Sequence, residues 1–139
     1  MDSILVFDKK RRGWLTEDLT LTEFKCKCRF KSCTRTFVLP ATARAFQLTR
    51  NIYGEPIRVT SAFRCQRHNE RVGGVPNSMH KLGAAIDIRP FKDIFDKDEL
   101  KRLRIIAETY FDVVLEYEGF LHCHMNYLDD KIPLAEFAN

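Results

Sequence analysis

The chain has 139 residues, of which 45% are hydrophobic and 30% charged, and its formal net charge is +4. This length is that of one domain with its own hydrophobic core, and the composition is neither that of a disordered chain nor that of a membrane-embedded one. No stretch approaches the roughly 20 apolar residues of a membrane-spanning helix, so we expect no membrane span.

The N-terminal residues do not have the order of a secretory signal. The apolar run at residues 4–7 precedes the basic run at residues 9–12, whereas an export signal places its positive charge first. We therefore expect a protein without a signal peptide that is made in the cytoplasm.

The first forty residues show no regular periodicity. They predict an irregular N-terminal segment, residues 1–40, that wraps around a core, residues 41–127, within a single domain of residues 1–139. The segment contains three of the five cysteines, Cys26, Cys28 and Cys33, whose spacing lacks the fourth ligand and the paired arrangement of a zinc knuckle. Free buried thiols or one disulfide are the default expectation, and a structural zinc is the alternative.

Hydrophobic periodicity predicts the elements of the core. In chain order, the pattern indicates a helix over 41–53, strands over 57–61 and 84–88, a helix over 97–110, and strands over 111–117 and 120–127. A tight turn at Glu118 and Gly119 joins the last two strands. These elements predict an α+β fold with a mostly antiparallel sheet of three to four strands and helices packed on one side.

Three of the four histidines lie in two motif-like segments. Asp87 follows His80 by seven residues, inside an apolar strand, where a carboxylate is costly unless it is paired or bound to a metal. His122 and His124 alternate along the last strand, so both rings point to one face and Cys123 to the other. Three nitrogen or oxygen ligands with an open fourth position are typical of catalytic zinc, so the residues predict one Zn²⁺ ion held by His80, Asp87 and one of the pair.

One glycine supports the predicted metal site, and the remaining histidine is not assigned to it. Gly83 fits the sharp chain reversal that would bring the first histidine and the aspartate to one point. The fourth histidine, His68, is interpreted as an ordinary hydrogen-bonded side chain.

A longer string of residues surrounds the metal motif: Ser61-Ala-Phe-Arg64, Asn69, Val72-Gly-Gly-Val75, Ser78-x-His80-x-x-Gly83-x-Ala85-x-Asp87 and His122-x-His124. This string resembles the D-alanyl-D-alanine carboxypeptidase-like zinc peptidases, which are related to the hedgehog signalling domain and include many phage lysins. The resemblance covers about residues 22–127. It implies hydrolysis of peptidoglycan stem peptides, by carboxypeptidase or L,D-endopeptidase action, in a monomeric phage or prophage cell-wall lysin.

The resemblance also implies a role for each matching residue. Zinc would be held by His80, Asp87 and His124, while His122 would hydrogen-bond the reacting carbonyl or its oxyanion. Arg64 would bind either a peptide carbonyl of the substrate or the free C-terminal carboxylate of the substrate. Ser78 would be a substrate contact.

The general base is where the sequence departs from part of this family. Many members carry an acid three residues before the last zinc histidine, but Leu121 occupies that position here. In the hedgehog-like arrangement the acid lies six residues before it, which predicts Glu118 as the base. Glu116 and His122 are the reserve candidates.

Two other functions are compatible with parts of the sequence. A non-catalytic zinc module that binds the cell wall or a partner would account for Leu121 at the usual position of the base. A nucleic-acid-binding surface could use the basic residues 25–35 with their interleaved aromatics, but it would leave the metal motif unexplained, so we expect no nucleic acid partner.

The resemblance to phage lysins also implies where the protein acts. We expect action on the cell wall after release from the cell or as part of a phage particle.

Overall fold

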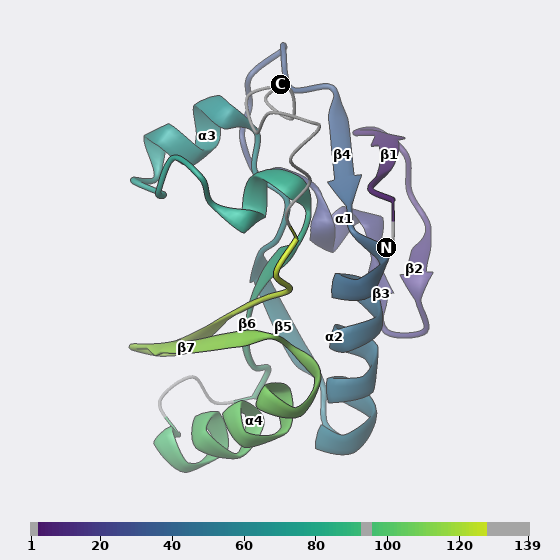
Figure 1. Cartoon of the computed structure of the whole chain (residues 1–139). Helices are drawn as coiled ribbons and strands as arrows, with labels where there is room; N and C mark the ends of the chain where they lie inside the picture. Colours follow the sequence, from purple (N-terminus) through teal and green to yellow (C-terminus); the bar gives the residue numbers. More distant parts are fainter. Residues whose placement is uncertain (1–2, 93–95, 128–139) are drawn as a thin grey trace.

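A four-stranded antiparallel sheet forms the centre of the computed structural model, which describes residues 3–92 and 96–127 (Figure 1). Residues 1–2, 93–95 and 128–139 of the predicted single domain lie outside the described residues. The strand order is β5 (Ile57–Ser61), β6 (Ala85–Pro90), β8 (Phe120–His124) and β7 (Val113–Tyr117).

One long helix packs on this sheet, and a second long helix packs against the first. α4 (Lys97–Tyr110) contacts β6, β7 and β8, and it also packs against α2 (Pro40–Tyr53). The sheet contributes buried residues to the hydrophobic core, and four of them have no exposed surface: Ile86, Ile88, Leu121 and Cys123. The predicted α+β class with a mostly antiparallel sheet is confirmed. No helix in the described parts of the chain is long and apolar enough to cross a membrane.

Local sequence signals explain where both helices begin and end. Pro40 occupies the first turn of α2, where its missing N–H costs nothing, and Gly54 ends the helix in the left-handed conformation. Asp96 caps α4 by accepting hydrogen bonds from the backbone N–H groups of its first turn. The two helices are joined where the Tyr53 hydroxyl donates a 2.6 Å hydrogen bond to Glu99.

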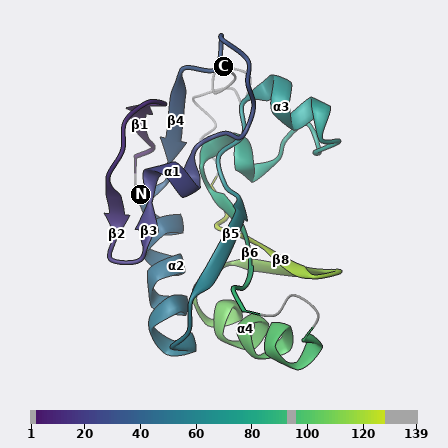
Figure 2. The ribbon, with the colours of Figure 1, turned by 180° about the vertical axis from the view of Figure 1, so that it is seen from behind.

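The segment before α2 contains regular structure that the sequence did not predict. β1 (Leu5–Asp8) pairs with β4 (Arg35–Val38), and β2 (Trp14–Thr16) pairs with β3 (Leu19–Thr20), each antiparallel. A short helix, α1 (Leu21–Phe24), follows β3. The β2–β3 pair lies beside the upper part of α2, and the β1–β4 pair lies above the start of that helix (Figures 1 and 2). These strands have two to four residues, which is too short for hydrophobic alternation to be recognised in the sequence.

Two short helical segments connect β5 to β6. α3 (Gln66–Arg71) follows β5, and the 3₁₀-helix η1 (Met79–Leu82) leads into β6. Gly83 joins η1 to β6 with φ = +69°, a left-handed conformation that favours glycine. A Cβ atom at this position would overlap the backbone of Phe37 in β4. The predicted reversal at Gly83 is therefore present, and it depends on close backbone packing as well as on φ.

Gly83→Ala should lower the free energy of unfolding by on the order of 3 kcal/mol, because it adds a backbone clash to the strain of a positive φ. Gly119→Ala is the matched control. Gly119 also has a positive φ, +83°, but nothing lies within 4 Å of a Cβ atom there. The control should cost only about 1 kcal/mol. Denaturant unfolding of both variants measures the difference, and equal losses would contradict the role of the β4 contact.

Candidate metal and substrate site

One row of residues crosses the sheet on the face that carries the candidate chemistry. Ser61, Asp87, His122 and Leu115 are successive partners from β5 to β7. Residues directly opposite each other in antiparallel strands project to the same face, so these four side chains share one side of the sheet. A bulge between Val59 and Ser61 brings the serine into this row.

His80 reaches this row from η1. The Ser78 side chain accepts a hydrogen bond from the His80 backbone N–H, at 3.2 Å, and so caps η1. The His80 ring is buried, with Nδ1 only 2.6 Å from the carbonyl oxygen of Ala62 and Nε2 3.1 Å from Oδ1 of Asp87. The Ala62 contact orients the ring so that Nε2 faces the carboxylate.

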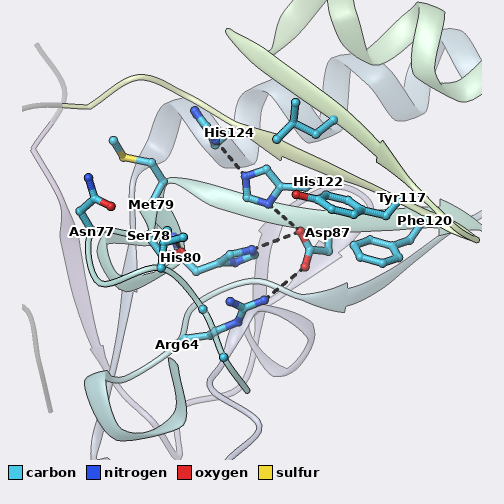
Figure 3. Close-up of a pocket in the computed structure, with 14 residues that line it drawn as sticks. Arg64, Asn77, Ser78, Met79, His80, Asp87, Tyr117, Phe120, His122 and His124 are labelled. Carbon is cyan, nitrogen blue, oxygen red and sulfur yellow. Dashed lines mark hydrogen bonds and ion pairs between the residues drawn. The ribbon is translucent and has the colours of Figure 1, made fainter. Parts of the chain in front are cut away.

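Three potential ligand atoms meet at this point. Nδ1 of His122 lies 2.9 Å from the same Oδ1 atom of Asp87 that His80 approaches, and the ligand atoms of these three residues all lie within 4.8 Å of one another (Figure 3). The structure therefore brings together two of the three predicted metal ligands, His80 and Asp87, with His122 as the third member of the cluster.

His124 lies next to this cluster. Its Nδ1 is 2.9 Å from Nε2 of His122, and its position on β8 pairs with Ala85, two residues from Asp87. Both rings of the pair lie on the same side of the sheet, while Cys123 is fully buried in the core. The prediction that His124 is the third ligand stays a prediction.

The donor set fits a metal ion. A neutral imidazole carries one N–H, yet both nitrogens of His80 face acceptors, the carbonyl of Ala62 and the carboxylate of Asp87. Protonation of both nitrogens would create a cation that is 1% exposed. A divalent cation between His80 and Asp87 would satisfy the nitrogen lone pair and the carboxylate together.

The pKa shifts favour the protonation states that a metal requires. Burial lowers the pKa of His80 more than the neighbouring carboxylate raises it. Burial also lowers the pKa of His124, and the adjacent His122 lowers it further. Burial alone would raise the pKa of Asp87, but its hydrogen bonds with His122 and His80 hold that pKa well below its usual range. Neutral imidazole and ionised carboxylate are the metal-binding forms.

Arg64 lies on the other side of Asp87. Its Nη2 is 3.4 Å from Oδ2 of the carboxylate, its Nε donates to Ser61 Oγ at 3.2 Å, and its Nη1 donates to Asn69 Oδ1 at 3.3 Å. Asn69 in turn donates to the carbonyl of Val75 at 2.9 Å. The guanidinium thus holds the second carboxylate oxygen, and Asn69 ties α3 to the following loop.

Arg64, the candidate metal ligands and their neighbours line one cavity of about 480 Å³. Its lining includes six of the seven predicted site residues: Arg64, Ser78, His80, Asp87, His122 and His124. The rings of Tyr117 and Phe120 stack at 5.1 Å between centroids and form the wall at the β7–β8 hairpin (Figure 3).

The predicted base, Glu118, is not among the residues that line this cavity. It is exposed and occupies the turn between β7 and β8, at the end of the hairpin that points away from α2 (Figures 1 and 2). Oε1 of Glu116 lies 3.5 Å from Nη1 of Arg104 in α4. Glu116 is therefore on the face of the sheet opposite the cavity. Its alternation along β7 with Leu115 and Tyr117 explains this orientation.

Sequence reasoning assigned no role to Asn69 or to the aromatic pair. Asn69 is 1% exposed, and its two hydrogen bonds position Arg64 and the loop after α3. Asn69 belongs to the family-like string in the sequence, but the role of its buried amide is not recognisable without its contacts. Phe120, however, has the same parity along β8 as His122 and His124, so alternation could have placed it in the cavity wall.

One family of known proteins matches most of the chain. A family model described as Peptidase M15 matches residues 17–124. The match includes the whole lining of the cavity and ends at His124. No curated protein matches the chain. Zinc dependence is a general property of this family, and the residues gathered around Asp87 are a candidate site for such an ion. The chain belongs to the peptidase M15 family.

Proposed function

We propose that the protein is a zinc-dependent peptidase that hydrolyses peptide bonds in peptidoglycan stem peptides. The observation that carries the proposal is the cluster of potential ligands His80, Asp87 and His122 in the cavity. Within it, Nε2 of His80 faces Oδ1 of Asp87, and both atoms can donate a lone pair to a metal ion. Family membership supports peptidase chemistry, and the resemblance to D-alanyl-D-alanine carboxypeptidases supports the cell-wall substrate.

We propose His80, Asp87 and His122 as the zinc ligands. Metal-bound histidines usually give their second N–H to an acceptor that fixes the ring. His80 has this partner in the carbonyl of Ala62, and His122 has it in Nδ1 of His124. Arg64 provides the equivalent contact for Asp87. In the alternative, His124 binds the metal and His122 contacts the reacting carbonyl.

The ion would supply a Lewis acid and a water molecule of lowered pKa. The chain must then provide a proton acceptor and a group that orients the substrate. Arg64 borders the cavity, where its guanidinium can orient a peptide carbonyl or a terminal carboxylate. Glu118 is the proposed acceptor that later returns the proton to the leaving amine.

The lining of the cavity is compatible with cleavage at the end of the substrate and with cleavage within the stem peptide. A free carboxylate beside Arg64 would give carboxypeptidase action, while a peptide carbonyl there would give endopeptidase action. Either activity suits a phage or prophage lysin that acts as a monomer. Mass spectrometry of digested peptidoglycan identifies the bond that is cleaved.

A non-catalytic zinc module remains the second candidate function. It is favoured by one observation: among the described residues, Asp87 provides the only carboxylate that lines the cavity, and it is already engaged by three cationic or imidazole side chains. Such a module would bind peptidoglycan without cleaving it.

Metal content of single variants tests the ligand set. Each of His80→Ala, Asp87→Asn and His122→Ala should lose one zinc per chain relative to the wild type. His124→Ala should keep that zinc with an affinity lowered about 10–100-fold, because it removes only the partner of a ligand. His68→Ala is the control, since His68 does not line the cavity. Complete loss in His124→Ala with retention in His122→Ala, measured by titration with a chelator, would instead identify His124 as the ligand.

Hydrolysis of a D-Ala-D-Ala stem peptide tests the base. Glu118→Gln should lower kcat about 10²–10⁴-fold without loss of zinc, as expected for removal of a general base. Glu116→Gln is the matched control and should leave kcat unchanged, because its carboxylate lies on the opposite face of the sheet beside Arg104. If Glu118→Gln retains full activity, the base lies elsewhere. If the wild type is no faster than His80→Ala, the protein is not a peptidase.

A further inference from the structure

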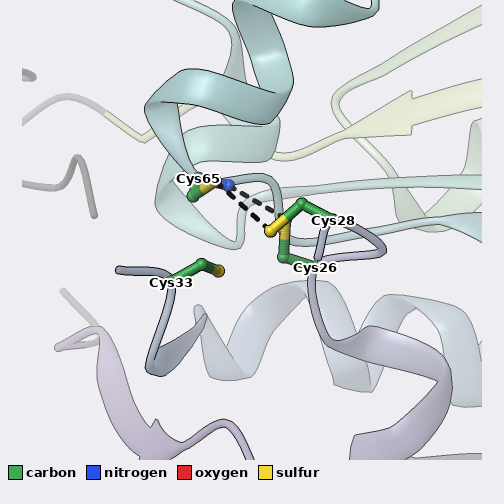
Figure 4. A group of neighbouring side chains, drawn as sticks. All are labelled: Cys26, Cys28, Cys33 and Cys65. Atoms are coloured by element: carbon green, nitrogen blue, oxygen red, sulfur yellow. Dashed lines mark hydrogen bonds between the residues drawn. The ribbon is translucent and has the colours of Figure 1, made fainter. Parts of the chain in front are cut away.

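Four of the five cysteines form a second cluster of potential ligands. Their Sγ atoms all lie within 4.8 Å of one another, although Cys65 is far from Cys26, Cys28 and Cys33 in the sequence (Figure 4). Cys26 and Cys65 are each 1% exposed and Cys33 is 5% exposed. The cluster supplies the fourth thiol that the spacing of the N-terminal three lacked.

The spacing and chemistry of this cluster fit zinc. Zinc–sulfur bonds of about 2.3 Å place the sulfurs of a tetrahedral site roughly 3.8 Å apart. The Sγ atoms of Cys28 and Cys65 are 3.8 Å apart. Four thiolates without a water position are the donor set of structural zinc sites, whereas the His and Asp ligands of the cavity are typical of catalytic ones.

The surroundings of the cluster are suited to thiolate charge. The backbone N–H of Cys65 points to Sγ of Cys26 at 3.4 Å, and that of His68 points to Sγ of Cys65 at 3.4 Å. Nζ of Lys9 lies 3.3 Å from Sγ of both Cys28 and Cys33. N–H donors and a cation around the sulfurs stabilise a zinc–thiolate centre.

The position of the cluster links two parts of the fold. Three of its cysteines lie in the connection from α1 to β4, and Cys65 is the N-cap of α3. Cys65 follows Arg64 directly, and α3 carries Asn69, the partner of Arg64 in the cavity wall. None of the four cysteines lines the cavity.

We infer that Cys26, Cys28, Cys33 and Cys65 bind a second, structural zinc ion that fastens the N-terminal segment to α3. This ion is separate from the one proposed in the cavity and does not take part in hydrolysis. It fixes the backbone from which Arg64 extends. The inference does not depend on the peptidase activity.

Cobalt substitution of the full-length, reduced chain tests the site. The double variant His80→Ala/His122→Ala removes the cavity site, so that one equivalent of Co²⁺ should still bind and give thiolate-to-cobalt charge-transfer absorption. Adding Cys28→Ser to this background should remove that absorption. Cys123→Ser is the matched control, because its thiol lies outside the cluster, and it should keep the full signal.

Two measurements on the cysteine-intact double variant do not depend on how a cysteine variant folds. X-ray absorption at the zinc edge should show four sulfur neighbours. Thiol titration of the denatured, metal-stripped chain, purified without reductant, should give five free thiols. Absence of bound metal, nitrogen or oxygen neighbours at the zinc, or fewer than five thiols because of disulfides would overturn the inference.

Discussion

The buried carboxylate of Asp87 is the constraint on which the arrangement of the site depends. An ionised carboxylate that is 5% exposed costs several kcal/mol unless its oxygens are compensated. One oxygen faces His80 and His122, and the other faces Arg64. These partners come from η1, β8 and the segment after β5, so compensating one charge requires three separate parts of the chain to meet.

The fold supplies rigid support for each of these partners. Asp87 and His122 are cross-strand neighbours in the centre of the sheet, where backbone hydrogen bonds fix their separation. His80 depends on less regular structure, namely the Ser78 cap, the Ala62 carbonyl and the turn at Gly83. Sites supported by such contacts hold their geometry within the narrow limits that metal binding needs.

Much of the core was predictable because its signals are local. The strand at Ile57–Ser61 and the helix at Lys97–Tyr110 have the predicted bounds, and the helix at Pro40–Tyr53 begins one residue earlier than predicted. Strand alternation also predicted that Cys123 points away from His122 and His124, and that face proves to be the core. The strand predicted over 120–127 ends at His124, because its pairing with β6 stops opposite Ala85.

The features that sequence reasoning missed depend on contacts between distant segments. The strands β1 and β4 are separated by most of the N-terminal segment, so their pairing has no local periodic signal. The approach of Cys65 to the three earlier cysteines requires α3 to lie against the α1–β4 connection. Likewise, alternation alone does not tell which face of the sheet Glu116 occupies, whereas its ion pair with Arg104 of α4 places it opposite the cavity.

The alternation along β8 has a consequence for how this protein can change over evolutionary time. Leu121 and Cys123 fill the hydrophobic core, while the intervening His122 and the following His124 line the cavity. A shift of one residue in the pairing of this strand would exchange the two sets. These four consecutive positions are therefore constrained both by core packing and by the cavity, and an insertion or deletion among them would disrupt both.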